Sequence, residues 1–323
     1  MIRKLRTQRD NQQWMLDLAL NMRGRVQNFE RDDIEVPAGK RARNYRMLPK
    51  VWREAAERHE KLARRAQARG AHETATAHYD HAIEAYRMAQ HPIFFDDHPV
   101  KIQLCGKMAE MVERRSKVAS YPIERVEVPF DNGTTISCLL HLLPDRRKAP
   151  VVIYVPGMDQ TKEVFPKAHH NIALSRGFHV LAMDGPGQGN SNLQKIRAVK
   201  DNYERAGAAV ISYLQQRPEI DAKKIAIYGI SMGSYWSLRL SSYDHRAAAV
   251  ASYMSSDIAF RFCGLLKITQ PIAPSLRAIS FSVAVCMSIS SPSEAPDACF
   301  VIRLANHDAR TFESNYDSRI TPF

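Results

Sequence analysis

The feature that most constrains the fold is the stretch Ile-Ala-Ile-Tyr-Gly-Ile-Ser-Met-Gly-Ser at residues 225–234. An apolar run typical of a buried strand ends there at Ser231, which stands between Gly229 and Gly233 in the pattern G-x-S-x-G. This pattern indicates a sharp turn from a strand into a helix, which lifts the serine hydroxyl clear of the sheet. Side chains at the two glycine positions would collide within such a turn.

Ser231 is therefore a candidate nucleophile, because a base and a carbonyl group can both reach an exposed hydroxyl. Met232 is expected to open the next helix, where its backbone N–H has no helical acceptor. We predict that this N–H is one donor of an oxyanion hole.

Strands and helices alternate on both sides of this turn. The expected elements are an antiparallel hairpin over 123–143, strands over 151–155, 178–183, 224–228 and 247–253, and helices over 168–175, 202–215 and after Met232. This alternation predicts an α/β fold with a doubly wound, mostly parallel sheet and a site at the carboxyl ends of the strands.

The apolar spacing before residue 121 is helical. It predicts helices over 51–66, 74–89 and 99–117, and the spacing changes to that of a strand at Tyr121-Pro122. We expect a helical cap region over 1–120, a catalytic core over 121–257 and an atypical tail over 258–323. One helical pair resembles a single tetratricopeptide unit, but a solenoid needs several stacked copies.

Composition narrows the function classes. The net charge is +12, but basic residues of the first 120 positions are interleaved with glutamates, which indicates solvated helix faces rather than a nucleic-acid groove. No apolar run is long enough for a membrane span, and the first residues lack the pattern of a signal peptide. We expect a cytoplasmic protein. Five scattered cysteines without C-x-x-C predict neither a disulfide framework nor a zinc site.

Several stretches in chain order carry a family resemblance: Val-Pro-Gly-Met at 155–158, Asp-Gly-Pro-Gly-Gln-Gly at 184–189, and the serine turn at 229–233. Together they resemble the α/β-hydrolase superfamily. The branch of 2,6-dihydroxypseudooxynicotine hydrolase and the FrsA-like esterases is indicated by Ala-Gln-His-Pro-Ile-Phe at 89–94, Ile-Glu-Arg-Val-Glu-Val at 123–128 and Thr-Lys-Glu at 161–163.

The resemblance covers roughly residues 50–257. It implies a helical cap over an α/β-hydrolase sheet, with Ser231 as nucleophile. It also implies that the backbone N–H groups of Met158 and Met232 form the oxyanion hole, and that the reaction hydrolyses an ester or a carbon–carbon bond next to a ketone.

A serine nucleophile of this kind needs an acid and then a histidine later in the chain. Only His245 and His307 follow Ser231. His245 stands in Asp-His-Arg between a helix and a strand, where we expect a solvated turn, so His307 is the candidate base by elimination. Asp257 follows a strand and Asp297 lies nearer the usual interval, and the choice of acid stays open.

From residue 258 the tail shows no clear alternation of strands and helices. Either the tail supplies a divergent acid and histidine, or it replaces the usual C-terminal strands through truncation or an altered reading frame. The pattern favours replacement, which would leave Ser231 without a base.

The leading hypothesis is a serine hydrolase of a small organic carbonyl compound. The alternative is a catalytically impaired hydrolase-like protein that binds a ligand between cap and core. We expect no cofactor and no metal, because the glycines of 185–189 follow a later strand, whereas a dinucleotide loop follows the first strand of its unit. We expect a small-molecule substrate, no nucleic acid and no membrane, and a homodimer stays open.

Overall fold

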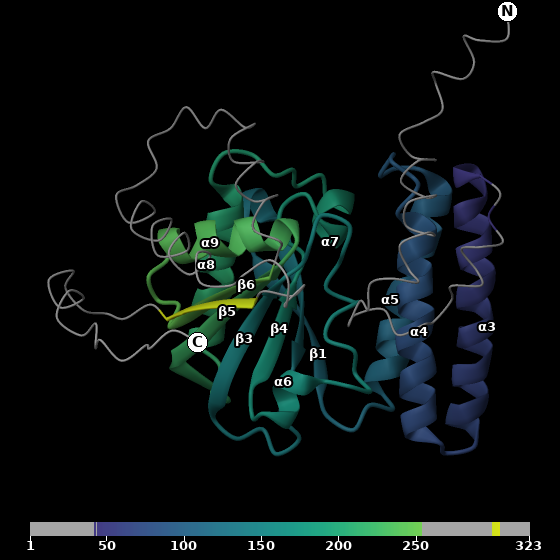
Figure 1. The fold of residues 1–323 in the computed structure, drawn as a ribbon, viewed down its shortest axis with the longest axis horizontal. Helices are drawn as coiled ribbons and strands as arrows, with labels where there is room; N and C mark the ends of the chain where they lie inside the picture. The colour runs from purple at the N-terminus through teal and green to yellow at the C-terminus, as the bar shows by residue number, and fades with distance from the viewer. Residues whose placement is uncertain (1–41, 43, 254–298, 304–323) are drawn as a thin grey trace, which may run out of the picture.

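The computed structural model describes residues 42, 44–253 and 299–303 of the 323-residue chain. In this part three long helices stand beside a seven-stranded sheet (Figure 1). The strands are β1 (Ile123–Pro129), β2 (Thr135–His141), β3 (Ala149–Val155), β4 (His179–Met183), β5 (Ile220–Ile230), β6 (Ala249–Tyr253) and β7 (Cys299–Arg303).

The sheet has the order β1-β2-β4-β3-β5-β6-β7. Strands β4, β3, β5 and β6 run parallel to one another, while β1, β2 and β7 join through antiparallel pairs. The α/β prediction is confirmed, since the centre of the sheet is parallel and β1 and β2 form the expected hairpin.

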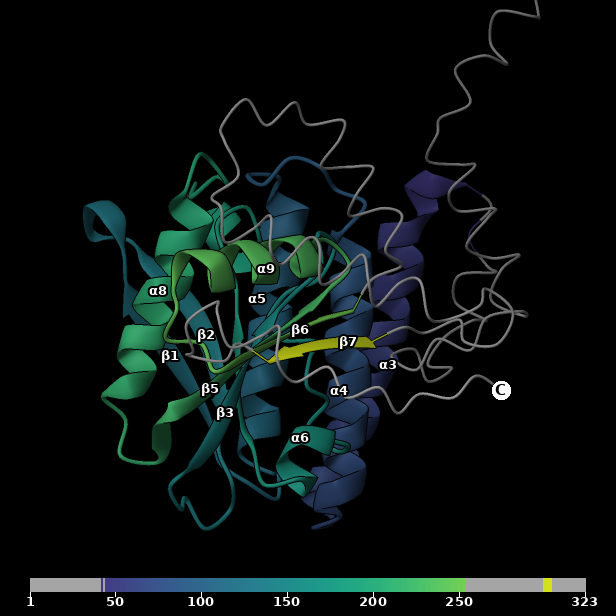
Figure 2. The same cartoon turned by 60° about the vertical axis from the view of Figure 1, so that its left-hand side comes forward.

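The helices are α3 (Leu48–Ala68), α4 (His72–Gln90), α5 (Pro99–Ser116), α6 (Ile172–Ser175), α7 (Gly189–Leu193), α8 (Asn202–Gln215) and α9 (Met232–Tyr243), with short 3₁₀ turns at Tyr45–Met47 and Asp131–Gly133. Helices α8 and α9 lie together against the sheet, away from α3 (Figure 2). None of the helices in the described ranges is long and apolar enough to cross a membrane.

Strand β3 shows why both faces of the sheet are covered. Val151, Ile153 and Val155 are buried in the same cluster as the apolar side chains of α8. Tyr154 faces the opposite side, where the centroid of its ring lies 4.2 Å from the centroid of the Phe165 ring. A strand buried on both faces needs a continuous apolar run, as the sequence has here.

The three long helices form a second core. Ala55 and Ala56 of α3 and Ala82 of α4 are fully buried, and such small side chains allow the helix backbones to approach closely. Gly70, with φ +73°, ends the first helix of the pair, as its position in the sequence indicates.

Several elements differ from the sequence prediction, among them β5, which begins at Ile220 rather than at 224. Helix α6 begins only at Ile172, because the Asn171 side chain accepts the Leu174 N–H at 3.2 Å and caps the helix there. Helix α7 lies where no helix was predicted. Strand β7 lies in the tail for which no regular strand was expected, although its Phe-Val-Ile run at 300–302 is β-prone.

Candidate active site

Ser231 is the single residue between β5 and α9. Its backbone has φ 54° and ψ −126°, and its side chain is exposed. A residue with a Cβ rarely adopts a positive φ, and such strain is concentrated at functional sites. The strained turn predicted from the sequence is therefore present.

The two glycines of the turn are required by contacts with backbone atoms. A Cβ on Gly229 would lie 2.2 Å from the carbonyl oxygen of Gly233, and one on Gly233 would lie 2.1 Å from that of Val155. A Cβ on Gly157 would lie 3.1 Å from the Cβ of Ser231. The loop after β3 therefore lies directly against the candidate nucleophile.

This loop is a tight turn over residues 157–160. The Gln160 N–H donates to the Gly157 carbonyl at 3.2 Å, and the Gly157 N–H donates to Gln160 Oε1 at 3.3 Å. The hydroxyl of Tyr154 donates to the same Oε1 at 2.5 Å. Met158 lies inside this turn, so its peptide group adjoins the residue that contacts Ser231, and its side chain is 72% exposed.

A glutamine from the turn after β4 also holds the loop. Gln188 is buried, and its Nε2 donates to the carbonyl oxygens of Pro156 and Gly157, both at 2.8 Å. Its Oε1 accepts from the hydroxyl of Tyr203 at 2.7 Å. The sequence alone gives Gln188 no role, because its two carbonyl partners lie 32 and 31 residues earlier in the chain.

A buried ionic cluster also joins the loop after β3 to the turn after β4. The ammonium group of Lys162 lies 2.6 Å from Glu163 and 2.7 Å from Asp184. Burial opposes the charge, but the two carboxylates outweigh it and raise the pKa of Lys162. Burial raises the pKa of Asp184 despite that ammonium group. Asp184 also accepts the backbone N–H groups of Lys162 and Asn190, both at 2.8 Å, which indicates a structural role.

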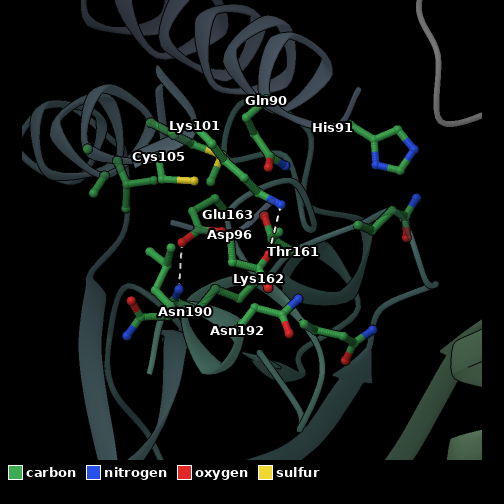
Figure 3. A pocket seen from close by; sticks show the side chains of 18 of the residues that line it. Gln90, His91, Asp96, Lys101, Cys105, Thr161, Lys162, Glu163, Asn190 and Asn192 are labelled. Carbon is green, nitrogen blue, oxygen red and sulfur yellow. Dashed lines mark hydrogen bonds and ion pairs between the residues drawn. The ribbon is translucent and has the colours of Figure 1, made fainter. Parts of the chain in front are cut away.

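A cavity of about 360 Å³ lies between the helices α4 and α5 and these loops. Figure 3 shows side chains of α4 and α5, including Gln90, Lys101 and Cys105, on one side of it. Of the described residues, those lining the cavity include Met158 and Gln188 but not Ser231. The cavity therefore reaches the loop after β3 without including the serine itself.

Buried arginines attach the helices to the loops of the core. Arg87 of α4 donates to the Asp159 carbonyl at 2.7 Å. Arg115 of α5 pairs with Asp80 at 2.6 Å, and the backbone N–H of His169 donates to Asp80 at 3.0 Å. The residue that follows Met158 is thus fixed to the helical region.

The structure brings Ser231, Met232 and the Met158 loop together, as the sequence suggested. His307, Asp257 and Asp297 lie outside the described residues. His245 is exposed in a turn, as expected. No histidine within the described ranges is hydrogen-bonded to Ser231, and these ranges contain no cluster of metal-binding side chains.

The sheet order and the strained serine between β5 and α9 define an α/β-hydrolase fold. The model for the family described as Esterase FrsA-like matches residues 38–263, and the chain belongs to this family. The crystal structure of the 2,6-dihydroxy-pseudo-oxynicotine hydrolase matches with a TM-score of 0.56 and 24% identity over 72% of this chain and 62% of that one.

Curated relatives also match this chain, over a smaller share of their own length than that crystal structure. Alpha/beta hydrolase gkaG of Penicillium citrinum is 28% identical over 62% of this chain and 49% of that protein. The 2,6-dihydropseudooxynicotine hydrolase of Paenarthrobacter nicotinovorans is 27% identical over 50% of this chain and 42% of that protein. The chain spans about half the length of the curated relatives it matches.

Proposed function

We propose that this chain is a serine hydrolase that acts on a small organic carbonyl compound, either an ester or a carbon–carbon bond next to a ketone. The strained, exposed Ser231 between β5 and α9 is the observation that carries the proposal. Membership of the FrsA-like esterase family and the hydrolase names of the relatives support it.

In the proposed reaction, Ser231 Oγ attacks the carbonyl carbon while a base takes the hydroxyl proton. The negative oxygen that forms accepts hydrogen bonds from the backbone N–H groups of Met158 and Met232. The base returns the proton to the leaving alkoxide or carbanion, and water then releases the acyl group from the serine. We propose His307 as this base, with Asp257 or Asp297 as the acid that orients it.

Helices α3, α4 and α5 are proposed to act as a cap, within a cap region of 1–120, a core of 121–257 and a tail of 258–323. The cavity between α4, α5 and the loops after β3 and β4 supports this role. Its volume falls in the range of small-molecule pockets, and a covered cavity excludes a folded polypeptide as substrate.

The test is labelling of the full-length protein with a fluorophosphonate, which reacts with activated serines. We expect Ser231→Ala to abolish labelling and Ser116→Ala, a serine of α5, to leave it unchanged. His307→Ala is expected to remove labelling, and His245→Ala to preserve it. A wild-type protein that labels no faster than Ser231→Ala would exclude Ser231 as an activated nucleophile.

The second candidate function is ligand binding without turnover. It is favoured by the cavity being lined by Met158 but not by Ser231. This function predicts an unlabelled wild-type protein whose melting temperature nevertheless rises with small esters or β-diketones that stay unhydrolysed.

A further inference from the structure

The peptide group between Gly157 and Met158 is fixed from its carbonyl side. The Gly157 oxygen accepts from Gln188 Nε2 at 2.8 Å and from the Gln160 N–H at 3.2 Å. A carbonyl oxygen has two lone pairs, so these two donors use both. The C=O and N–H of one trans peptide point in opposite directions, so holding the oxygen also sets the direction of the Met158 N–H.

The amide of Gln188 is itself held in one orientation. Its nitrogen carries two hydrogens and has two carbonyl acceptors, those of Pro156 and Gly157. Its oxygen can only accept, so the hydroxyl of Tyr203, at 2.7 Å, must be the donor. A flipped amide would place its oxygen against two carbonyl oxygens.

The neighbouring residues make room for this arrangement. Tyr203 is fully buried, and a Cβ on Gly185 would lie 2.3 Å from its ring. Gly187 has φ +85°, a conformation that a residue with a Cβ rarely adopts. A side chain at position 185 would therefore displace the tyrosine ring whose hydroxyl holds Gln188.

We propose that Gln188 is the positioning residue of the oxyanion hole and that Tyr203 fixes the orientation of its amide. Gln188 acts through the Gly157 carbonyl: it aims the Met158 N–H, and by donating to the carbonyl it polarises the same peptide group. This inference rests on the proposed function, in which that N–H stabilises the negative oxygen.

The test compares Gln188→Met with Gln194→Met in the full-length protein. Gln194 is a matched control because its amide also holds backbone at both ends, accepting from the Thr135 N–H at 3.2 Å and donating to the Thr135 carbonyl at 3.1 Å. Both substitutions thus remove an amide that holds backbone, but only Gln188 contacts the loop beside Ser231.

One readout does not depend on activity. In protein labelled with ¹⁵N-methionine, we expect the Met158 amide resonance to move in Gln188→Met and to stay in place in Gln194→Met. The other readout is the rate of fluorophosphonate labelling at Ser231. We expect it to fall about 10- to 100-fold in Gln188→Met, less than the loss of a whole oxyanion donor, and to stay near the wild-type rate in Gln194→Met.

Tyr203→Phe provides a milder version, because it removes only the donor that orients the Gln188 amide. We expect a shift of the same resonance and a several-fold slower labelling. A Met158 resonance that is unchanged in both Gln188→Met and Tyr203→Phe overturns the inference. Failure of the wild-type protein to label would instead overturn the proposed nucleophile, and the Met158 resonance would still decide whether Gln188 sets this peptide.

Discussion

The ion pair between Arg115 and Asp80 is expected to be a main link between the long helices and the core. Arg115 Nη1 lies 2.6 Å from Asp80 Oδ1, and the two side chains are 1% and 2% exposed. The other Asp80 oxygen interacts with the backbone N–H of His169 at 3.0 Å and with its Nδ1 at 2.7 Å. The pair therefore joins α4, α5 and the loop before α6 in a place without solvent screening.

Replacing one partner leaves the other as a buried charge, which costs about 3–5 kcal/mol of folding free energy. In Arg115→Met, Asp80 keeps its contacts with His169, so we expect a loss near the lower value of about 3 kcal/mol. In Asp80→Leu, Arg115 keeps only the Glu163 carbonyl at 3.3 Å, and its Nε and Nη2 have no partner in the described structure. The loss there should approach about 5 kcal/mol.

Urea unfolding measures both values, with Trp52 of α3 and Trp236 of α9 as fluorophores in the two regions. The matched control is Lys117→Met. Lys117 follows α5 and pairs with Glu113 at 2.9 Å, but both side chains are exposed. We expect no change of the unfolding midpoint in this control. The reasoning is refuted if Arg115→Met unfolds at the same urea concentration as Lys117→Met, or if it costs more than Asp80→Leu.

Two further predictions concern the turn and the histidines. Gly233→Ala should lose about 3 kcal/mol or more of folding free energy, because the added Cβ would overlap the Val155 carbonyl. Gly106→Ala in α5 adds a Cβ in open space and should gain up to about 1 kcal/mol. Thermal melting of the two variants compares these effects. Burial and the neighbouring histidines lower the pKa of His59 and His81 from 6.5 to about 4. The unfolded chain therefore binds more protons than the folded protein between these pH values, so the free energy of unfolding should fall as the pH drops from about 6.5 toward 4. Replacing both histidines by glutamine should make the urea midpoint depend less on pH across that range.

Local signals were sufficient to predict most of the regular structure. Helix α8 was expected over 202–215, and it has these bounds because its apolar residues keep one spacing throughout. The hairpin of β1 and β2 has both the alternation of a strand and a turn with Asn132 and Gly133 at positive φ. Helix α7 escaped prediction because the Asp184 carboxylate that accepts its Asn190 N–H lies outside the helix.

One part of the candidate site could be predicted from a short stretch of sequence, and another part could not. The Ser231 turn could be predicted because both glycines lie within two residues of the serine, so the chemistry and its steric requirement share one short stretch. A ligand site between cap and core was expected, but the residues that line the cavity could not be predicted, because they come from α4, α5 and loops about 50 to 100 residues later. The buried pair of Asp80 and Arg115 gave no signal either, since each residue alone looks like an ordinary charge on a helix.

The glycine-rich turn after β4 also contributes polar side chains that hold the candidate site. Two of its side chains reach the loop after β3 at different points. Asp184 accepts the Lys162 N–H, and a Cβ on Gly189 would lie 2.2 Å from its carboxylate. Gln188 donates to the Gly157 carbonyl. One bond takes a backbone donor and the other a backbone acceptor, so together they fix both ends of the loop that lies against Ser231. Asp184, which precedes the glycines, and Gln188, which lies between two of them, therefore both hold the loop beside the candidate nucleophile.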